Sequence, residues 1–517
     1  MTVTAVCAAM VASGPAARAG GIPGLSPGFI PGNLVVSESF YTPDAGIVAG
    51  KTQLPPGCVT GCVTATAGGA YPQVFNNDLV DANFGVTSRI FLSQLTPSGR
   101  PLGTFAVPGL VTSFSSKSEL ALNLSPDGRT LSFMGYVAKP DQVDVSNSNT
   151  PGVIDPTNPV PGAFYRAAAQ LSGDGRIRLT ETNAYSGNNG RAAITAEAGG
   201  KQLIYTAGNA GNGSNPQPDG VILGAGAQLI TPGAPSAITG PGTPTPVGSF
   251  NITELGDKAD KIGKDDNFRG LTIFNNVLYY TKGSGGNGVN TVYFLDTTGK
   301  ACPNGVGLPA AGASLPASPL SYDPSTLQAN GLPSNMCVLR GFPTVLKSAT
   351  SFPFGLWFAN ADTLYVADEG NDTTTFSGGT YTAAAAQTTA GLQKWVFDGT
   401  QWKLAYTLRA GLNLGQPYTV RGYPTGTNAA TGLPWAPATD GLRNITGQVN
   451  KNGTVTIWAV TSTVSGGGDQ GADPNKLVAI TDPVTATAPA AGESFRTVQT
   501  ARFAEVIRGV SFTPGTR

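Results

Sequence analysis

The sequence has 517 residues, of which 31 are Lys or Arg and 31 are Asp or Glu, so its formal net charge is zero. This balance argues against the strongly basic surfaces with which proteins bind nucleic acid or anionic membranes. The chain contains no histidine, which excludes Ser-His-Asp and Cys-His catalysis and every histidine-ligated metal site.

Residues 1–19 have the features of a secretory signal. An apolar run at residues 3–12 is followed by Ala17-Arg18-Ala19, small residues of the kind that precede a signal-peptide cleavage site. A disordered apolar N-terminus is the alternative. The rest of the chain contains no stretch of 18 apolar residues, so we expect no membrane span. The sequence thus predicts a secreted protein, with a signal-like segment at 1–19 and a single domain at 20–517.

A pattern of four short strands recurs along the rest of the chain. Its clearest copy runs through residues 353–408, where a two-stranded hairpin is followed by a loop and two further strands. Most of the hairpin turns carry Asn, Asp or Gly, the residues that tolerate positive φ angles. One four-stranded sheet cannot bury both of its faces, so repeated sheets of this kind indicate a β-propeller. Hairpins of this kind are predicted at residues 119–136, 191–207, 269–282, 353–368 and 443–461.

The two ends of the chain together supply a further unit. N-terminal strands are predicted at residues 33–39, 89–95 and 101–107, and a lone strand is predicted at residues 506–512. Placing the C-terminal strand innermost, beside residues 33–39, removes two open sheet edges. The sequence therefore predicts an all-β, six-bladed β-propeller with four antiparallel strands per blade. The C-terminal strand closes the ring by joining the N-terminal blade, and we expect a monomer.

Long loops gather on one face of the predicted propeller. They join the second and third strands of each blade, whereas the turns on the opposite face are mostly short. Loops displayed on a rigid scaffold are where binding sites commonly lie, so we expect the long-loop face to bind. An insertion at residues 297–337 is the exception, because it should lie toward the other face or the rim. The long loops are residues 40–88, 137–162, 208–219, 283–290, 369–390 and 462–474.

The cysteines indicate disulfides. Loss of Cys7 with the signal-like segment leaves four cysteines, an even number that is typical of disulfides in an exported protein. Proximity in sequence favours pairing of Cys58 with Cys62 and of Cys302 with Cys337. Metal binding by the Cys58–Cys62 pair is the weaker alternative, since no second thiol or imidazole pair lies nearby in sequence.

Arginine recurs at one equivalent position of the predicted innermost strands, near the mouth of the central channel. Because guanidinium groups present forked donors to carboxylate or phosphate, these residues are candidates for binding a small anion. The four candidates are Arg191, Arg269, Arg443 and Arg508.

Acidic residues lie three positions before three of these arginines: Asp266, Asp440 and Glu505. Each arginine could therefore pair with an acid of its own or the next blade and fasten the ring together, which we consider the stronger interpretation. A third interpretation assigns Asp265, Asp266, Asp440 and Glu505 to a bound Ca²⁺, because hard cations require a cluster of oxygen ligands.

The strand Leu364-Tyr365-Val366-Ala367-Asp368 with the following Glu369-Gly370-Asn371, preceded by Pro353-x-Gly355, resembles the NHL repeat of six-bladed propellers. The turn Ser125-Pro126-Asp127-Gly128-Arg129 resembles that of secreted bacterial propellers. The strand is also similar to strands of the gluconolactonase and regucalcin lactonase group. The resemblance implies the propeller fold. It also implies a metal held by Glu, Asn and Asp from several blades.

Two functions follow as expectations. The first is a binding or scaffold protein that uses the long-loop face for a small anionic ligand or an extracellular partner. The second is a metal-dependent, Ca²⁺-type lactonase or phosphoesterase built on carboxylates at the channel mouth. We expect the strand tryptophans to belong to the core between blades rather than to sugar-stacking platforms; these are Trp357, Trp395, Trp402 and Trp458.

Overall fold

The computed structural model of the protein describes residues 28–41, 51–54, 63–64, 86–114, 120–143, 145–154, 158, 160, 162–209, 226–233, 267–283, 289–302, 304–318, 336–345, 350–429, 431–467 and 470–516. In these ranges helix is confined to α2 (Thr382–Ala386), η1 (Val145–Asn147) and η2 (Gln470–Ala472). No helix in the described ranges has the length and apolar character that a membrane crossing requires. The signal-like segment at 1–19 and the expected Cys58–Cys62 pair lie outside the described residues.

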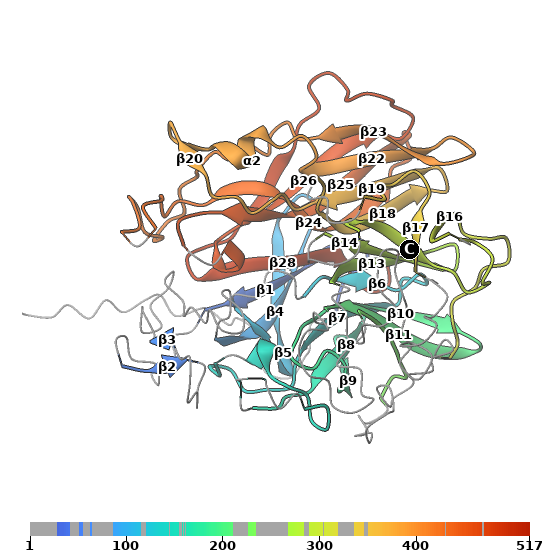
Figure 1. Ribbon diagram of the computed structural model, residues 1–517, viewed down its shortest axis with the longest axis horizontal. Coiled ribbons are helices and arrows are strands. Elements are labelled where there is room, and N and C mark those ends of the chain that lie inside the picture. The colour runs from blue at the N-terminus through green and yellow to red at the C-terminus, as the bar shows by residue number, and fades with distance from the viewer. Residues whose placement is uncertain are drawn as a thin grey trace, which may run out of the picture.

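Four separate sheets are arranged as in a β-propeller (Figure 1). In each sheet, neighbouring strands are antiparallel and follow chain order, except that the short β16 pairs in parallel at the edge of its sheet. The first sheet is β10 (Gly190–Ala198), β11 (Lys201–Gly208) and β12 (Ala227–Ile230). The second is β13 (Phe268–Phe274), β14 (Val277–Lys282), β15 (Thr291–Leu295), β17 (Met336–Leu339) and β16 (Val306–Gly307). The third is β18 (Pro353–Asn360), β19 (Thr363–Asp368), β22 (Gly391–Phe397) and β23 (Trp402–Leu408). The fourth is β24 (Ala438–Val449), β25 (Thr454–Val464), β26 (Lys476–Pro483) and β27 (Arg496–Thr500).

A fifth, larger sheet differs from the expected blades, so the described residues form four separate blade-like sheets where six were expected. Its eight strands fall into two groups, and β5 and β7 are joined only through the pair Val111–Tyr136. The first group is β28 (Glu505–Phe512), β1 (Leu34–Phe40), β4 (Thr87–Leu95) and β5 (Pro101–Ser113). The second is β7 (Thr130–Tyr136), β8 (Arg166–Ser172) and β9 (Ile177–Thr182), with β6 (Asn123–Leu124) on β7.

The C-terminal strand pairs with the N-terminal one, as the sequence predicts. Strands β28 and β1 run antiparallel from the pair Leu34–Phe512 to the pair Phe40–Glu505, with an irregularity between Ser37 and Glu38. The two strands lie side by side in Figure 1. The predicted pairing of residues 506–512 with residues 33–39 is confirmed, and it covers a sheet edge that would otherwise be open.

The hairpin turns follow the predicted residue chemistry. Asn275 and Asn276 join β13 to β14 with φ angles of 47° and 60°, the left-handed values that a two-residue hairpin of this type requires at both positions. Two further ribbons, β2 (Gln53–Leu54) with β3 (Val63–Thr64) and β20 (Phe376–Ser377) with β21 (Thr380–Tyr381), belong to long loops. Both ribbons and α2 lie toward the left of Figure 1, whereas β16 lies at the right.

Neighbouring sheets are joined by buried polar contacts in addition to apolar packing. Lys394 on β22 is completely buried, and its Nζ lies 2.9 Å from Oδ2 of Asp482 on β26. The hydroxyl groups of Tyr365 and Tyr406 both donate hydrogen bonds to the same Asp482 carboxylate. Because β26 belongs to the next sheet, this network joins the third sheet to the fourth. Of the strand tryptophans, Trp395, Trp402 and Trp458 are buried as expected, but Trp357 is only half-buried.

The first strands of successive sheets touch one another at the centre of the molecule. Strand β10 contacts β13, β13 contacts β18, β18 contacts β24, and β24 contacts β28. The approach is so close that a Cβ atom at Gly270 would collide with the carbonyl oxygen of Phe354 on β18. The side-chain oxygen of Asn444 on β24 accepts hydrogen bonds from the backbone amides of Val510, at 2.7 Å, and Leu122, at 3.3 Å. These contacts bring the first strands closest together part-way along their length.

Candidate functional site

All four candidate arginines are buried on the first strands of their sheets. Arg191 is the second residue of β10 and Arg269 the second of β13, while Arg443 lies on β24 and Arg508 on β28. Each side chain is between 4% and 6% exposed. A buried guanidinium must be compensated by acceptors, so the partners of these residues decide what the arrangement can do.

Arg269 and Arg443 meet at Glu369, and these three residues form the arginine–glutamate cluster. Nη2 of Arg269 lies 3.5 Å from Oε1 of Glu369, and Nε of Arg443 donates to Oε2 at 3.2 Å. Each carboxylate oxygen thus faces one arginine from a different sheet. Nη2 of Arg443 is buried and has no hydrogen-bond acceptor among the described residues.

The backbone on both sides holds Glu369 in place. Glu369 directly follows β19, and its amide donates to the carbonyl of Phe352 at 3.0 Å. Its carbonyl accepts a hydrogen bond from the hydroxyl of Ser462 on β25 at 2.5 Å. A residue that begins the long loop 369–390 is therefore anchored between two sheets. This carboxylate lies in the NHL-like segment, but the regular spacing of acids before arginines did not point to it.

Arg508 has a different environment, made largely of backbone oxygens. Its Nε donates to the hydroxyl of Ser39 at 3.3 Å, and its Nη2 donates to the carbonyls of Ser113, at 3.2 Å, and Phe114. Ser39 lies on β1 and Ser113 ends β5, so Arg508 ties together three strands of the large sheet. Its side chain supports the sheet whether or not a ligand is present.

Asp440 does not pair with Arg443, so the expected pair within one blade is wrong here, whereas Arg269 does face an acid of the next sheet, Glu369. The Asp440 carboxylate accepts from Nε2 of Gln387 at 2.6 Å and from the backbone amide of Asp372 at 2.8 Å, and it thereby fixes the loop 369–390. Burial, followed by the nearby charge of Asp372, raises the pKa of Asp440 to about 7. A Cβ atom at Gly370, whose φ is 85°, would collide with this carboxylate.

Glu505 lies against a second carboxyl group, that of Glu38 on β1. Burial raises the pKa of both residues, and that of Glu38 reaches about 7 with a further contribution from the charge of Glu505. Glu38 accepts hydrogen bonds from Ser93, at 2.6 Å, and Gln499, at 3.0 Å, and Glu505 accepts from the backbone amide of Arg502 at 3.1 Å. The remaining two acidic candidates, Asp265 and Asp266, lie outside the described residues.

Asp473 is a buried acid near Arg443 that the sequence pattern did not reveal. Its Oδ1 accepts hydrogen bonds from Tyr423, at 2.8 Å, and Ser465, at 3.0 Å. Burial raises its pKa to about 7, although hydrogen bonds and the charge of Arg443 oppose the shift. Asp473 belongs to the long loop 462–474, so two long loops supply acids close to the cluster.

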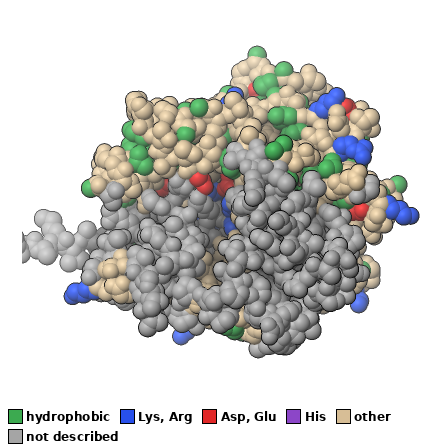
Figure 2. Space-filling model, in the orientation of Figure 1, with side chains coloured by type: hydrophobic (Ala, Val, Ile, Leu, Met, Phe, Trp, Pro, Cys, Tyr) green, Lys and Arg blue, Asp and Glu red, His purple; other side chains and the backbone are tan. Residues whose placement is uncertain are grey.

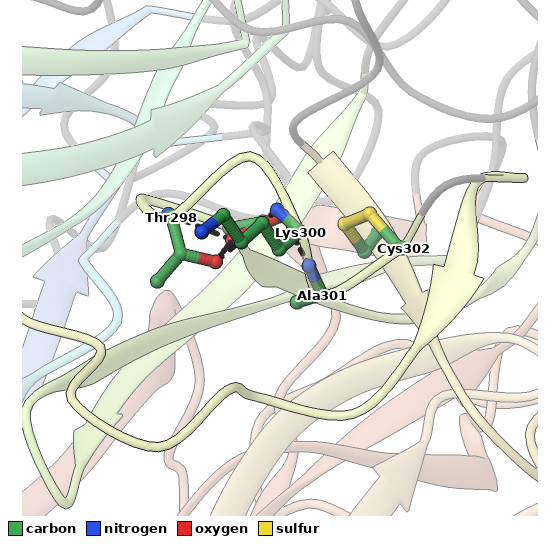
Figure 3. The surroundings of a disulfide bond; sticks show 6 residues. Thr298, Lys300, Ala301 and Cys302 are labelled. Carbon is green, nitrogen blue, oxygen red and sulfur yellow. Dashed lines mark hydrogen bonds between the residues drawn. A yellow bond between two sulfur atoms is a disulfide. The ribbon is translucent and has the colours of Figure 1, made fainter.

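Metal ligation has one geometric candidate among the described residues. Asp296, Cys302 and Cys337 have ligand atoms within 4.8 Å of one another. The two cysteines form the predicted disulfide, however, and Figure 3 shows the sulfur atoms bonded to each other. The Asp296 carboxylate accepts hydrogen bonds from the amides of Thr298 and Ala301, both at 2.8 Å. Because the disulfide leaves neither cysteine as a free thiol, these three residues stabilise the 297–337 insertion and its start rather than form a metal site. Among the described residues, neither Asp440 nor Glu505 belongs to a group of three or more possible metal ligands.

The surface agrees with a protein of low charge. Figure 2 shows few charged side chains among the described residues of this face, with Asp or Glu atoms beside Lys or Arg atoms in a hollow near its middle.

Comparisons with known proteins leave the family open. No protein-family model matches the sequence, and no curated protein matches it. The chain is 8% identical to an acylaminoacyl peptidase of Pyrococcus horikoshii (80% of this chain and 43% of that chain covered, TM-score 0.28). It is 11% identical to the hemagglutinin-neuraminidase ectodomain of parainfluenza virus 5 (83% and 76% covered, TM-score 0.27). It is 10% identical to an ACO/RPE65 chimera (83% and 59% covered, TM-score 0.20). The chain therefore spans less than half of the peptidase, and likenesses this low carry no functional argument.

Proposed function

We propose that this protein is a secreted, six-bladed β-propeller that binds a small anionic ligand at the arginine–glutamate cluster. The observation that carries the proposal is the buried Nη2 of Arg443, a charged donor without an acceptor among the described residues. Leaving such a donor unmatched is costly in free energy, and a bound carboxylate or phosphate oxygen would remove that cost.

Two observations support six blades. Because the large sheet is joined between β5 and β7 by a single residue pair, it divides naturally into two blades of four strands each. In addition, β28 contacts β6 and β6 contacts β10. Together with the contacts from β10 through β13, β18 and β24 back to β28, these make a continuous circuit of six first strands. The disulfide between Cys302 and Cys337 supports export, because such bonds persist in oxidising compartments.

The unmatched donor of Arg443 supports an anion rather than a cation. Arginine stays protonated in proteins, and in this cluster two guanidinium groups face one carboxylate. The nearby Asp440 and Asp473 have pKa values of about 7, so at neutral pH these two groups are only partly ionised. Together they contribute about one negative charge, which with Glu369 about balances the two arginines, so the described charges leave room for a small anion beside Arg443. Arg443 is the residue whose free donor the ligand would engage.

Titration calorimetry with inorganic phosphate, citrate and galacturonate tests the proposal. We expect the wild-type protein to bind at least one of these anions and Arg443→Gln to lose the binding. Arg129→Gln is the matched control, since Arg129 is an exposed arginine in a short hairpin turn. If no anion binds to the wild-type protein, or if Arg443→Gln binds as well as Arg129→Gln, the anion site is wrong.

A further inference from the structure

A cavity of about 780 Å³ lies at the opposite ends of the first strands from the arginine–glutamate cluster. Its lining comes from the later parts of β13, β18, β24 and β28, from Ile194 on β10, and from β6 with the turn that follows it. This volume falls in the range of about 300–1,000 Å³ that is usual for small-molecule sites. Five of the described sheets contribute to it, so it is a feature of the assembled centre rather than of one loop.

Aliphatic and aromatic side chains together form the apolar part of the lining. The rings of Phe274 and Phe358 stack with their centroids 4.4 Å apart. Trp357 also lines the cavity, and its indole ring lies so close to Gly447 that a Cβ atom there would collide with it. Trp357 is half-buried, and its indole nitrogen donates no hydrogen bond to another residue in the described part of the chain. A tryptophan placed in this way offers a ligand both an apolar surface and a donor.

Uncharged polar side chains also line the cavity. Ser511 on β28 is 2% exposed and lines the cavity, yet its hydroxyl makes no hydrogen bond within the described residues. Thr272, Thr446 and Gln448 add further hydroxyl and amide groups. Among the described lining residues the only charged one is Asp127, whose Oδ1 already accepts from the hydroxyl of Ser125 and the amide of Arg129.

We propose that this cavity, here called the strand-end cavity, binds a neutral saccharide. A charged ligand would find no free counter-charge among the lining residues that the structure describes. A purely apolar ligand would leave the Ser511 hydroxyl and the Trp357 indole nitrogen without partners, at a cost in free energy. A sugar ring satisfies both requirements, because it presents C–H groups to an aromatic ring and hydroxyl groups to serine, threonine and amide side chains.

The strand-end cavity is separate from the proposed anion site. Asn444 bonds to Val510 and Leu122 at the narrow centre of the molecule. Arg443 precedes Asn444 on β24, whereas the cavity lining on β24 begins at Ile445. Saccharide binding therefore does not depend on Arg443, and each proposal can fail without the other.

Saturation-transfer difference NMR and calorimetry with cellobiose, maltose and diacetylchitobiose test the inference. We expect the wild-type protein to bind at least one of them, and Trp357→Ala to weaken that binding about tenfold or more, as for the loss of an aromatic anchor. Ser511→Ala, which removes only a hydroxyl group, should weaken it as well and guards against misfolding of the tryptophan variant. Leu404→Ala, at a side chain 44% exposed on β23 outside the lining, and Arg443→Gln should bind normally.

The inference is overturned if none of the three disaccharides binds to the wild-type protein. It is equally overturned if a disaccharide binds with the same affinity to the folded Trp357→Ala and Ser511→Ala variants. Binding of hexanol without any disaccharide would show that the strand-end cavity takes apolar molecules instead.

Discussion

The side-chain oxygen of Asn444 accepts a hydrogen bond from the backbone amide of Val510 at 2.7 Å. The same oxygen also accepts from the amide of Leu122, so one side chain on β24 contacts both β28 and the segment just before β6. Main-chain amides buried away from water need acceptors, and here neither β28 nor the segment before β6 supplies one. The centre of the fold is thus held by a side chain where backbone pairing between sheets is absent.

Replacement of Asn444 tests this role. Asn444→Ala leaves two buried amides without an acceptor, and each costs about 1–3 kcal/mol. We expect the free energy of unfolding to fall by about 2–6 kcal/mol in urea titrations. Asn452→Ala, at an exposed residue of the next hairpin turn, should change it by less than about 1 kcal/mol. Equal effects of the two substitutions would contradict the central role of Asn444.

Removal of the shared carboxylate in the arginine–glutamate cluster should also be costly. Glu369→Gln removes the carboxylate that two buried guanidinium groups share, for which a loss of about 3–5 kcal/mol is expected. Glu197→Gln serves as the control, because Glu197 is exposed on β10. The measurement is denaturant unfolding of both variants beside the wild-type protein. A near-normal stability of Glu369→Gln would show that the two arginines are compensated by other groups.

The buried acids predict a dependence of stability on pH. Folding raises the pKa of Glu38 from 4.5 to about 7, and it raises the pKa of Glu505 as well. The folded state therefore holds more protons than the unfolded state between these pH values, and the free energy of unfolding falls as pH rises from about 4.5 to about 7. Asp440 and Asp473 act in the same direction.

Glu38→Gln isolates one part of this effect, since glutamine does not titrate. Denaturant unfolding at pH 5 and at pH 8 should show a smaller loss of stability for Glu38→Gln than for the wild-type protein. Glu197→Gln should retain the full loss. A stability that rises over this interval in the wild-type protein would contradict the assignment.

The network around Lys394 predicts non-additive substitutions. Lys394→Met removes the charge that lies 2.9 Å from Asp482, and breaking a buried pair in this way typically costs about 3–5 kcal/mol. The double variant Lys394→Met with Asp482→Asn removes both charges, so it should be more stable than Lys394→Met alone. Thermal melting of Lys394→Met, of Asp482→Asn and of the double variant provides the test. Simple addition of two separate losses would argue against a coupled pair.

Local sequence rules predicted the strands and turns well, because they depend on neighbouring residues. Asn275 and Asn276 form the expected turn, and the pairing of residues 506–512 with residues 33–39 followed from the need to cover sheet edges. The merging of two groups of strands into one large sheet was not foreseen. It depends on the single pair Val111–Tyr136, which has no distinctive sequence pattern.

The candidate site could be predicted only in part, because some of its contacts also have no distinctive sequence pattern. The recurring arginines were identified from the alignment of strands, and they are buried on first strands. Their partner Glu369 could not be identified, because it meets Arg269 and Arg443 through sheet packing rather than through a fixed spacing. Trp357 likewise has the sequence context of a core residue, and only the assembled sheets reveal that it lines the strand-end cavity.

The contact between β1 and β28 imposes an order on biosynthesis. Arg508 bonds to Ser39 across 469 positions of sequence, so strand β1 leaves the ribosome long before its neighbour β28 has been translated. During that interval one edge of β1 is open to pairing with other chains. Closure of so long a loop is also a slow step in folding. The large sheet of this protein therefore stays incomplete until Phe512 has been translated.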